Sequence, residues 1–177
     1  RTNARAIADL FADQSGKFVC ASAGHHLEAL MAAHGSGAVD LSRSHHKTFL
    51  NVDIGGGTTK FAILHGGQLL SSSAIAVGGR LIAFDADGRM IRIEEPVRKV
   101  SADIGLNLEL GEVLPTSSRS ALVSRLVDVL VKAIRLEAND PLMRELFVTD
   151  PLHWHDKIDA VTFSGGVSEY KIGRAHV

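Results

Sequence analysis

A glycine-rich turn between two strand-like segments is the feature that most constrains this chain. Residues 48–54 and 60–64 both read as strands, and Gly55, Gly56 and Gly57 lie between them. Because glycine has no side chain, the backbone N–H groups of such a turn can approach phosphate oxygens closely. The turn is neither a dinucleotide-binding loop nor a Walker loop, since both of those lead from a strand into a helix.

The polar side chains at this turn favour a nucleotide phosphate with its metal. Thr58 and Thr59 add hydroxyl donors where the second strand begins. Asp53, at the end of the first strand, is placed to hold hydrated Mg²⁺ or to orient the attacking water. A glycine-rich hairpin with an ordinary turn is the simpler alternative, and the strand-turn-strand context weighs against it. We therefore predict Asp53 as the catalytic and metal-binding residue.

A second glycine pair near the other end of the sequence strengthens this interpretation. Residues 158–163 read as a buried strand that runs into Ser164, Gly165 and Gly166. Such a turn lets the adenosine or α-phosphate of a nucleotide lie against the backbone. Alone, the motif is more simply a strand-to-helix turn, and it gains weight from its pairing with the first. The predicted nucleotide-binding residues are Gly55, Gly56, Gly57, Thr58, Thr59, Gly165 and Gly166.

The remaining segments indicate an α/β chain. Apolar residues at helical spacing predict helices over residues 3–14, 24–35 and 118–137. In the second of these helices, the predicted apolar stripe is Leu27, Leu30 and Met31. Further strands are predicted over residues 17–22, 68–77, 81–84 and 90–93, so that the strands from residue 48 onward form antiparallel hairpins.

Several polar segments carry a weaker signal. Residues 38–47 read as a connection with the start of a strand, and residues 97–115 are ambiguous. A short helix is possible between Pro141 and Pro151. No internal repeat or low-complexity tract appears.

Composition argues against several kinds of partner. The chain has 177 residues, 45% of them hydrophobic, and a formal net charge of -1, which gives no field to gather nucleic acid or an anionic membrane. No apolar run approaches the roughly 20 residues of a membrane span, and the polar start does not resemble a signal peptide. The single Cys20 cannot form an internal disulfide. We expect a cytoplasmic location, with no nucleic-acid or membrane partner.

Other candidate ligands carry less weight. His25 and His26 cannot easily chelate one ion, because neighbours on a helix point about 100° apart, and solvated or capping roles are favoured for the histidines at 45–46 and at 153 and 155 as well. Residues 85–88 mimic the start of a calcium loop, but no glutamate follows at the required spacing. Glu28 could face a nucleotide cleft, yet a helical carboxylate is more often a solvated surface group. We leave all of them out of the predicted site.

The two glycine motifs together resemble those of a known superfamily. Residues 53–58 are similar to the second phosphate motif of the actin, Hsp70 and sugar-kinase ATPases, and residues 163–167 to their adenosine motif. More specifically, a set of flanking strings resembles the EutA family of ethanolamine ammonia-lyase reactivating proteins. These strings occupy residues 3–5, 21–24, 26–28, 35–38 and 77–81. The resemblance runs over the chain as far as Tyr170.

The resemblance implies an α/β, actin-like ATPase fold of the ribonuclease H type, with ATP and Mg²⁺ as cofactors. It implies an ATP-dependent, chaperone-like factor that releases damaged cobalamin from its partner, ethanolamine ammonia-lyase, in the bacterial cytoplasm or with the ethanolamine microcompartment. Residues 55–59 would hold the β- and γ-phosphates, Asp53 the metal and water, and residues 165–166 the adenosine side. A small-molecule or sugar kinase and an actin-like, nucleotide-switched assembly protein remain alternatives, because fold alone cannot separate them.

The same resemblance predicts how the chain is divided. Residues 1–45 would end the first actin-like domain and include its connecting helix, and residues 46–170 would form much of the second, nucleotide-binding domain. Since the family's first phosphate motif would precede Arg1, we expect a fragment that carries half of the ATP clamp. Residues 171–177 read as an artefact of a sequencing adapter. The oligomeric state is left open.

Overall fold

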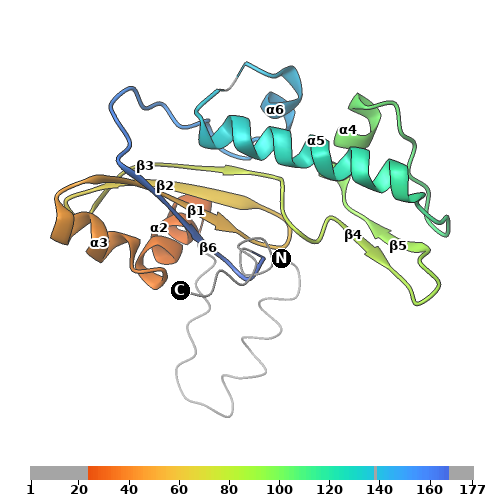
Figure 1. Ribbon diagram of the computed structural model, residues 1–177, viewed down its shortest axis with the longest axis horizontal. Helices are drawn as coiled ribbons and strands as arrows, with labels where there is room; N and C mark the ends of the chain where they lie inside the picture. Colours follow the sequence, from red (N-terminus) through yellow and green to blue (C-terminus); the bar gives the residue numbers. More distant parts are fainter. Residues whose placement is uncertain (1–23, 138, 168–177) are drawn as a thin grey trace, which may run out of the picture.

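A mixed four-stranded sheet between two layers of helices forms the centre of the computed structural model, which describes residues 24–137 and 139–167 (Figure 1). Strands β1 (Thr48–Ile54), β2 (Thr59–His65) and β3 (Gln68–Ile75) form the predicted antiparallel meander. Strand β6 (Ala160–Ser164) pairs parallel with β1, which gives the order β3-β2-β1-β6. The predicted α/β class is confirmed.

Strand β1 lies inside the sheet, and helices cover both of its faces. Leu50, Val52 and Ile54 point into the larger core, whereas Phe49 points to the opposite face. All four are buried. The apolar residues of β1, interrupted by Asn51 and Asp53, make the strand recognisable in the sequence. By the same alternation, Asp53 points to the face of Phe49.

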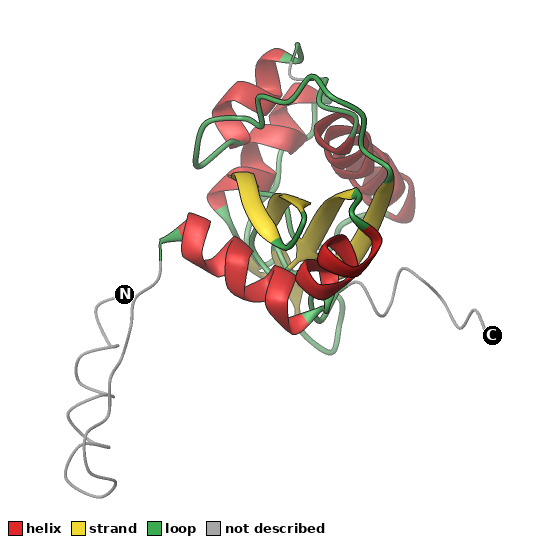
Figure 2. Ribbon diagram, turned by 90° about the vertical axis from the view of Figure 1, so that its left-hand side faces the viewer, coloured by secondary structure: helices red, strands yellow, loops and turns green. Residues whose placement is uncertain are grey.

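Helix α2 (His25–Gly35) covers that face of the sheet, but not with the predicted stripe (Figure 2). Leu27 and Met31 are 47% and 63% exposed, and the residues buried against β1 and β2 are Ala29 and Ala33. The prediction of the stripe was wrong because it followed side-chain size. Small alanines on the inner face let the helix backbone approach the sheet closely.

Residues 38–47 are also not the predicted connection. Helix α3 (Ala38–His45) begins after Gly37, whose φ of +76° few other residues adopt readily. Val39 and Ser42 are buried at helical spacing, and a stripe this narrow is hard to recognise within eight polar-rich residues. Helices α2 and α3, which both precede the predicted boundary after residue 45, pack on the sheet formed by the strands that follow it. The domain boundary proposed at that residue stays a prediction.

The opposite face of the sheet is covered by α5 (Thr116–Ile134), α4 (Glu95–Asp103) and α6 (Pro141–Leu146). The apolar face predicted for the long helix is confirmed, since its members are buried or partly buried in the larger core: Leu122, Leu126, Val129, Leu130, Ala133 and Ile134. Helix α4 takes up part of the ambiguous segment, and α6 is the short helix expected after Pro141.

A separate hairpin of β4 (Ile82–Phe84) and β5 (Met90–Ile93) extends beyond the sheet (Figure 1). In its turn, Asp85 Oδ1 accepts hydrogen bonds from the backbone N–H groups of Asp87 and Arg89. The carboxylate therefore stabilises the hairpin turn, in agreement with the choice of a hairpin over a calcium loop. In the part of the chain that the structure describes, no helix is long and apolar enough to cross a bilayer.

Four further predictions concern the ends of the chain. The helix over residues 3–14, the strand over residues 17–22 and the artefact at residues 171–177 all lie outside the described residues. The strand predicted over residues 158–163 forms as β6, but it is not buried. Val161 and Phe163 are 42% and 44% exposed because β6 is the edge strand of the described sheet.

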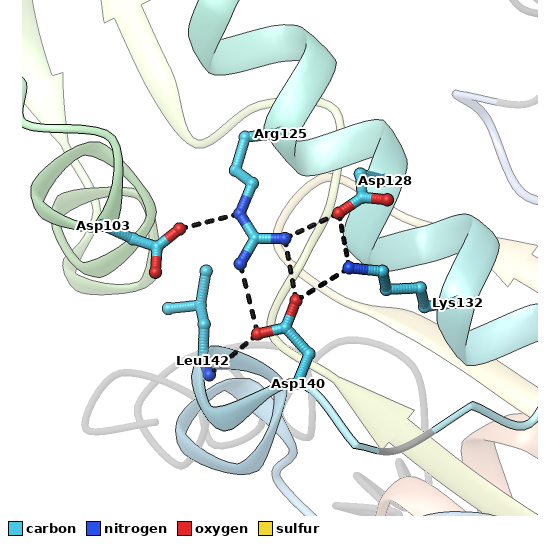
Figure 3. Close-up of polar contacts among 6 residues, drawn as sticks. All are labelled: Asp103, Arg125, Asp128, Lys132, Asp140 and Leu142. Atoms are coloured by element: carbon cyan, nitrogen blue, oxygen red, sulfur yellow. Dashed lines mark hydrogen bonds and ion pairs between the residues drawn. The ribbon is translucent and has the colours of Figure 1, made fainter.

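An ionic network joins the helices of the larger core (Figure 3). Arg125 of α5 donates to Asp140 at 2.8 and 3.1 Å, to Asp128 at 2.6 Å, and to Asp103 at the end of α4 at 2.7 Å. Asp140 also caps α6 by accepting from the N–H of Leu142 at 3.1 Å. One guanidinium thus holds three helices together with its planar fork of donors.

Acid should weaken this network through Asp140. Hydrogen bonds from Arg125, opposed by burial and supported by Lys132, lower the pKa of Asp140 from 3.8 to about 2. Because the pKa is lower in the folded protein, the stabilisation is complete above the unfolded pKa and is lost as the pH falls from about 4 to about 2. Over this window, the free energy of unfolding of the wild type, measured by urea denaturation, should fall by about 2 kcal/mol more than that of the Asp140→Asn variant. Parallel profiles of the two proteins would contradict this.

Candidate functional site

Three glycine-containing turns meet at one edge of the sheet. Strands β1, β3 and β6 point in the same direction, so the turns that follow them, at residues 55–57, 78–79 and 165–166, lie at the same edge. The Gly79 N–H donates to Gly55 O at 3.1 Å and the Arg80 N–H to Gly56 O at 2.7 Å. The two predicted motifs, far apart in sequence, are therefore neighbours in space.

The close approach of these turns explains why they are built from glycine. A Cβ on Gly78 would lie 2.4 Å from Gly56 O, and a Cβ on Gly165 would lie 2.4 Å from Ile54 O. Gly165 also has a φ of +92°. The turn at residues 78–79 was missed as part of the site, because in the sequence it stood out only within a string resembling EutA. The signal that could have revealed it is a glycine pair directly after the strand predicted over residues 68–77.

Asp53 lies beside these turns and is held by β6. Its side chain is 16% exposed, and Ser164 Oγ donates to Asp53 Oδ1 at 3.1 Å. Ser164 also accepts from Asn51 Nδ2 at 3.2 Å, and Asn51 Oδ1 accepts from Thr162 Oγ1 at 2.9 Å. Asn51 itself is buried. This row of cross-strand hydrogen bonds fixes the carboxylate of Asp53 relative to the glycine turn.

Lys60 and Glu28 complete the charged surroundings of Asp53. Lys60 is the direct cross-strand partner of Asp53, so both side chains lie on the same face of the sheet. Lys60 Nζ lies 4.0 Å from Asp53 Oδ2 and 3.3 Å from Glu28 Oε2, and its side chain is only 14% exposed. Sequence reasoning set Glu28 aside as solvated, whereas α2 brings it to this ion pair. The one available signal was a lysine within an otherwise apolar strand.

The two threonines of the motif occupy different environments. Thr59 is buried, and its hydroxyl donates to Val77 O at 2.7 Å. In this structure the Thr59 hydroxyl thus ties the glycine motif to the end of β3, which is not the phosphate contact predicted for it. Thr58 is partly exposed, and its carbonyl accepts from the Gly55 N–H at 2.9 Å, which closes the turn. The roles of both residues toward a nucleotide stay predictions.

The arrangement fits a phosphate group with a divalent metal. Gly56 and Gly57 leave the backbone of the turn partly open, whereas the Gly55 N–H is bonded to Thr58 O, and Asp53 offers a carboxylate beside the turn. Within residues 24–137 and 139–167, no group of three or more histidine, cysteine or carboxylate side chains gathers to hold a metal. Mg²⁺ commonly binds through one or two carboxylates, with the remaining ligands supplied by water and substrate phosphates. The donor set therefore suits Mg²⁺ that arrives with a nucleotide.

Two of the solved structures that match this chain in part are an MreB5 and an EutJ protein. MreB5 of Spiroplasma citri bound to ADP is 21% identical, with 93% of this chain and 54% of that chain covered and a TM-score of 0.42. The ethanolamine utilization protein EutJ from Carboxydothermus hydrogenoformans is 16% identical, with 80% and 41% covered and a TM-score of 0.34.

Two curated proteins are more similar in sequence to this chain than the solved structures above. The chain is 34% identical over 167 residues to the ethanolamine ammonia-lyase reactivase EutA of Salmonella typhimurium and 33% identical over 168 residues to that of Escherichia coli. Both alignments cover 94% of this chain and 36% of the relative, so the chain spans about a third of the length of these curated relatives. The family model for the ethanolamine utilisation protein EutA matches residues 1–176 of this chain. The chain therefore belongs to the EutA family.

Proposed function

We propose that the complete protein is an ATP-dependent reactivating factor for ethanolamine ammonia-lyase, built on an actin-like ATPase fold. The observation that carries the proposal is the meeting of three glycine turns around Asp53 at one edge of the sheet. Backbone N–H groups at such turns suit phosphate oxygens, and a fixed carboxylate beside them suits the metal of Mg-ATP. The names of the Salmonella and Escherichia relatives support the lyase as the partner.

In this proposal each part of the site has its own task. The backbone of residues 55–57, with Thr58, would hold the β- and γ-phosphates, and residues 165–166 would lie against the adenosine side. Asp53 would hold the hydrated Mg²⁺ and orient the attacking water through its fixed carboxylate. Bound Mg-ATP would supply the free energy of hydrolysis that drives release of damaged cobalamin from the lyase. The protein would act in the bacterial cytoplasm or at the ethanolamine microcompartment.

Membership of the EutA family makes the two alternatives less favoured. A sugar or small-molecule kinase would transfer the γ-phosphate to a metabolite, and an actin-like assembly protein would polymerise with ATP. Both would use the same glycine turns, so the phosphate site alone does not separate them. The lyase is the partner that the family relationship favours.

The deciding experiment is a reactivation assay with the complete protein. Ethanolamine ammonia-lyase is first inactivated with a cobalamin that lacks the adenosyl group, and adenosylcobalamin is then added with the protein and Mg-ATP. We expect turnover to return only when both the protein and ATP are present. Phosphorylation of a metabolite without recovery of the lyase would overturn the proposal in favour of a kinase, and filaments formed with ATP would favour the assembly protein.

A further inference from the structure

Lys60 has surroundings that an ordinary surface lysine lacks. Its ammonium lies between two carboxylates, at 3.3 Å from Glu28 Oε2 and 4.0 Å from Asp53 Oδ2. The side chain is 14% exposed, whereas Glu28 is 41% exposed. Long cationic side chains are rarely this buried unless a partner holds them. Neither contact is a strong reason for the burial, because Glu28 is half-exposed, where ion pairs stabilise proteins little, and Asp53 lies 4.0 Å away.

The position of Lys60 relative to the glycine turn suggests a second partner. Asp53 and Lys60 form the cross-strand pair that precedes the pair Ile54 and Thr59, from which the turn extends. A phosphate bound at residues 55–57 would therefore add negative charge close to both side chains. The negative charge of the phosphate would lie next to the negative charge of Asp53, so a cation is needed to offset the repulsion between them. A single divalent metal leaves a triphosphate with excess negative charge, so a second cation at this place is favourable.

We propose that Lys60 is a phosphate-binding residue of this site, and that Glu28 holds its ammonium in place before the phosphate arrives. The assignment rests on the proposed function, since it needs a nucleotide in the glycine turn. Lysine suits the task because its compact charge sits on a flexible four-carbon stem and can turn from one anion to another without a backbone movement. Glu28 Oε2 also lies 3.6 Å from His25 Nδ1, and its carboxylate is exposed enough to return to water when it loses Lys60.

The proposal links helix α2 to the state of the nucleotide. Glu28 lies in the first turn of α2, and Lys60 lies in β2, so their ion pair joins the helix to the sheet beside the glycine turn. A phosphate that takes the ammonium from Glu28 removes this link. Glu28 and the phosphate therefore compete for one cation, and loss of either competitor should strengthen the other contact.

The competition predicts opposite effects for two substitutions in the complete protein. Lys60→Met removes the cation, so the Kd for Mg-ATP measured by calorimetry should rise about tenfold. Glu28→Gln removes the competing carboxylate, so the same Kd should fall roughly threefold. Lys60→Arg keeps the charge and should remain within a few fold of the wild type. Lys47→Met, which alters an exposed lysine before β1, serves as the matched control with unchanged affinity.

AMP provides the second probe, because it lacks the β- and γ-phosphates. Its Kd should not change in any of these variants. If Lys60 only fixed α2 to the sheet, Lys60→Met and Glu28→Gln would shift the Kd for Mg-ATP in the same direction or not at all. That result would overturn the phosphate-binding role of Lys60 but leave the proposed function standing. A wild-type protein that binds no Mg-ATP would overturn the proposed function together with that role.

Discussion

Replacement of Gly165 by alanine is expected to destabilise the protein by about 3 kcal/mol or more, enough to unfold a marginally stable domain. A Cβ at this position would meet Ile54 O at 2.4 Å and Asp53 Oδ1 at 2.9 Å. The backbone of Gly165 also has a φ of +92°, which residues other than glycine rarely adopt. Because Ile54 is in the central strand, the contact cannot be relieved by a side-chain rotation, and β6 would have to move away from β1.

The adjacent glycine is the natural control for this prediction. A Cβ on Gly166 would meet no heavy atom within 4 Å, and its φ lies outside the left-handed region. Urea denaturation should therefore give a much lower midpoint for Gly165→Ala and a nearly unchanged midpoint for Gly166→Ala. Equal midpoints for the two variants would show that the turn after β6 does not press against β1 as described.

Substitution of Asp53 by asparagine should reduce the rate of Mg-ATP hydrolysis by about 100-fold in the complete protein. Asparagine retains an oxygen that can accept from Ser164 Oγ, so the hydrogen bond at 3.1 Å and the local fold should persist. The amide lacks the negative charge that would hold the metal and orient the water. The backbone of the glycine turn is unaltered, so we expect the Kd for ATP in the absence of metal to stay within about threefold of the wild type.

A carboxylate away from the glycine turns tests whether this loss is specific. Asp87 is exposed in the turn between β4 and β5, and Asp87→Asn should hydrolyse ATP at the wild-type rate. Hydrolysis should be measured as released phosphate, with the Mg²⁺ concentration varied for each protein. An Asp53→Asn variant that retains wild-type turnover at every Mg²⁺ concentration would rule out the role of Asp53 and leave the glycine turns without their predicted catalytic residue.

Local pattern was sufficient to predict most strands and the long helix. In the meander, β1 and β2 follow from apolar-rich segments on either side of a glycine turn, and β3 follows from the hairpin turn at residues 66–67. Helix α5 follows from six apolar residues at helical spacing. The helix α2 was predicted but its buried face was not, and α3 was missed altogether. The inner faces of these two helices carry mostly small or polar residues: Ala29, Ala33, Ala38 and Ser42, with Val39. Apolar size is a poor guide where the helix backbone itself lies close to the sheet.

The candidate site was predicted only as far as its backbone motifs. Residues 53–58 and 165–166 were recognisable because glycine in these contexts has a physical reason that can be read locally. Their association with residues 78–79, and the ion pair of Lys60 with Glu28, depend on which strand ends at which edge of the sheet. That information arises from tertiary packing, and no local spacing contains it.

The parallel pairing of β6 with β1 sets the order in which this site can form during synthesis. Ser164 follows Asp53 by 111 residues, so a ribosome that adds about 5–20 residues per second makes the partner of Asp53 roughly 6–20 s after Asp53 itself. The meander of β1 to β3, which needs only short hairpin turns, can form microseconds after it becomes free. Through that interval the nascent chain has an open sheet edge at β1, a surface where chaperones would be expected to bind.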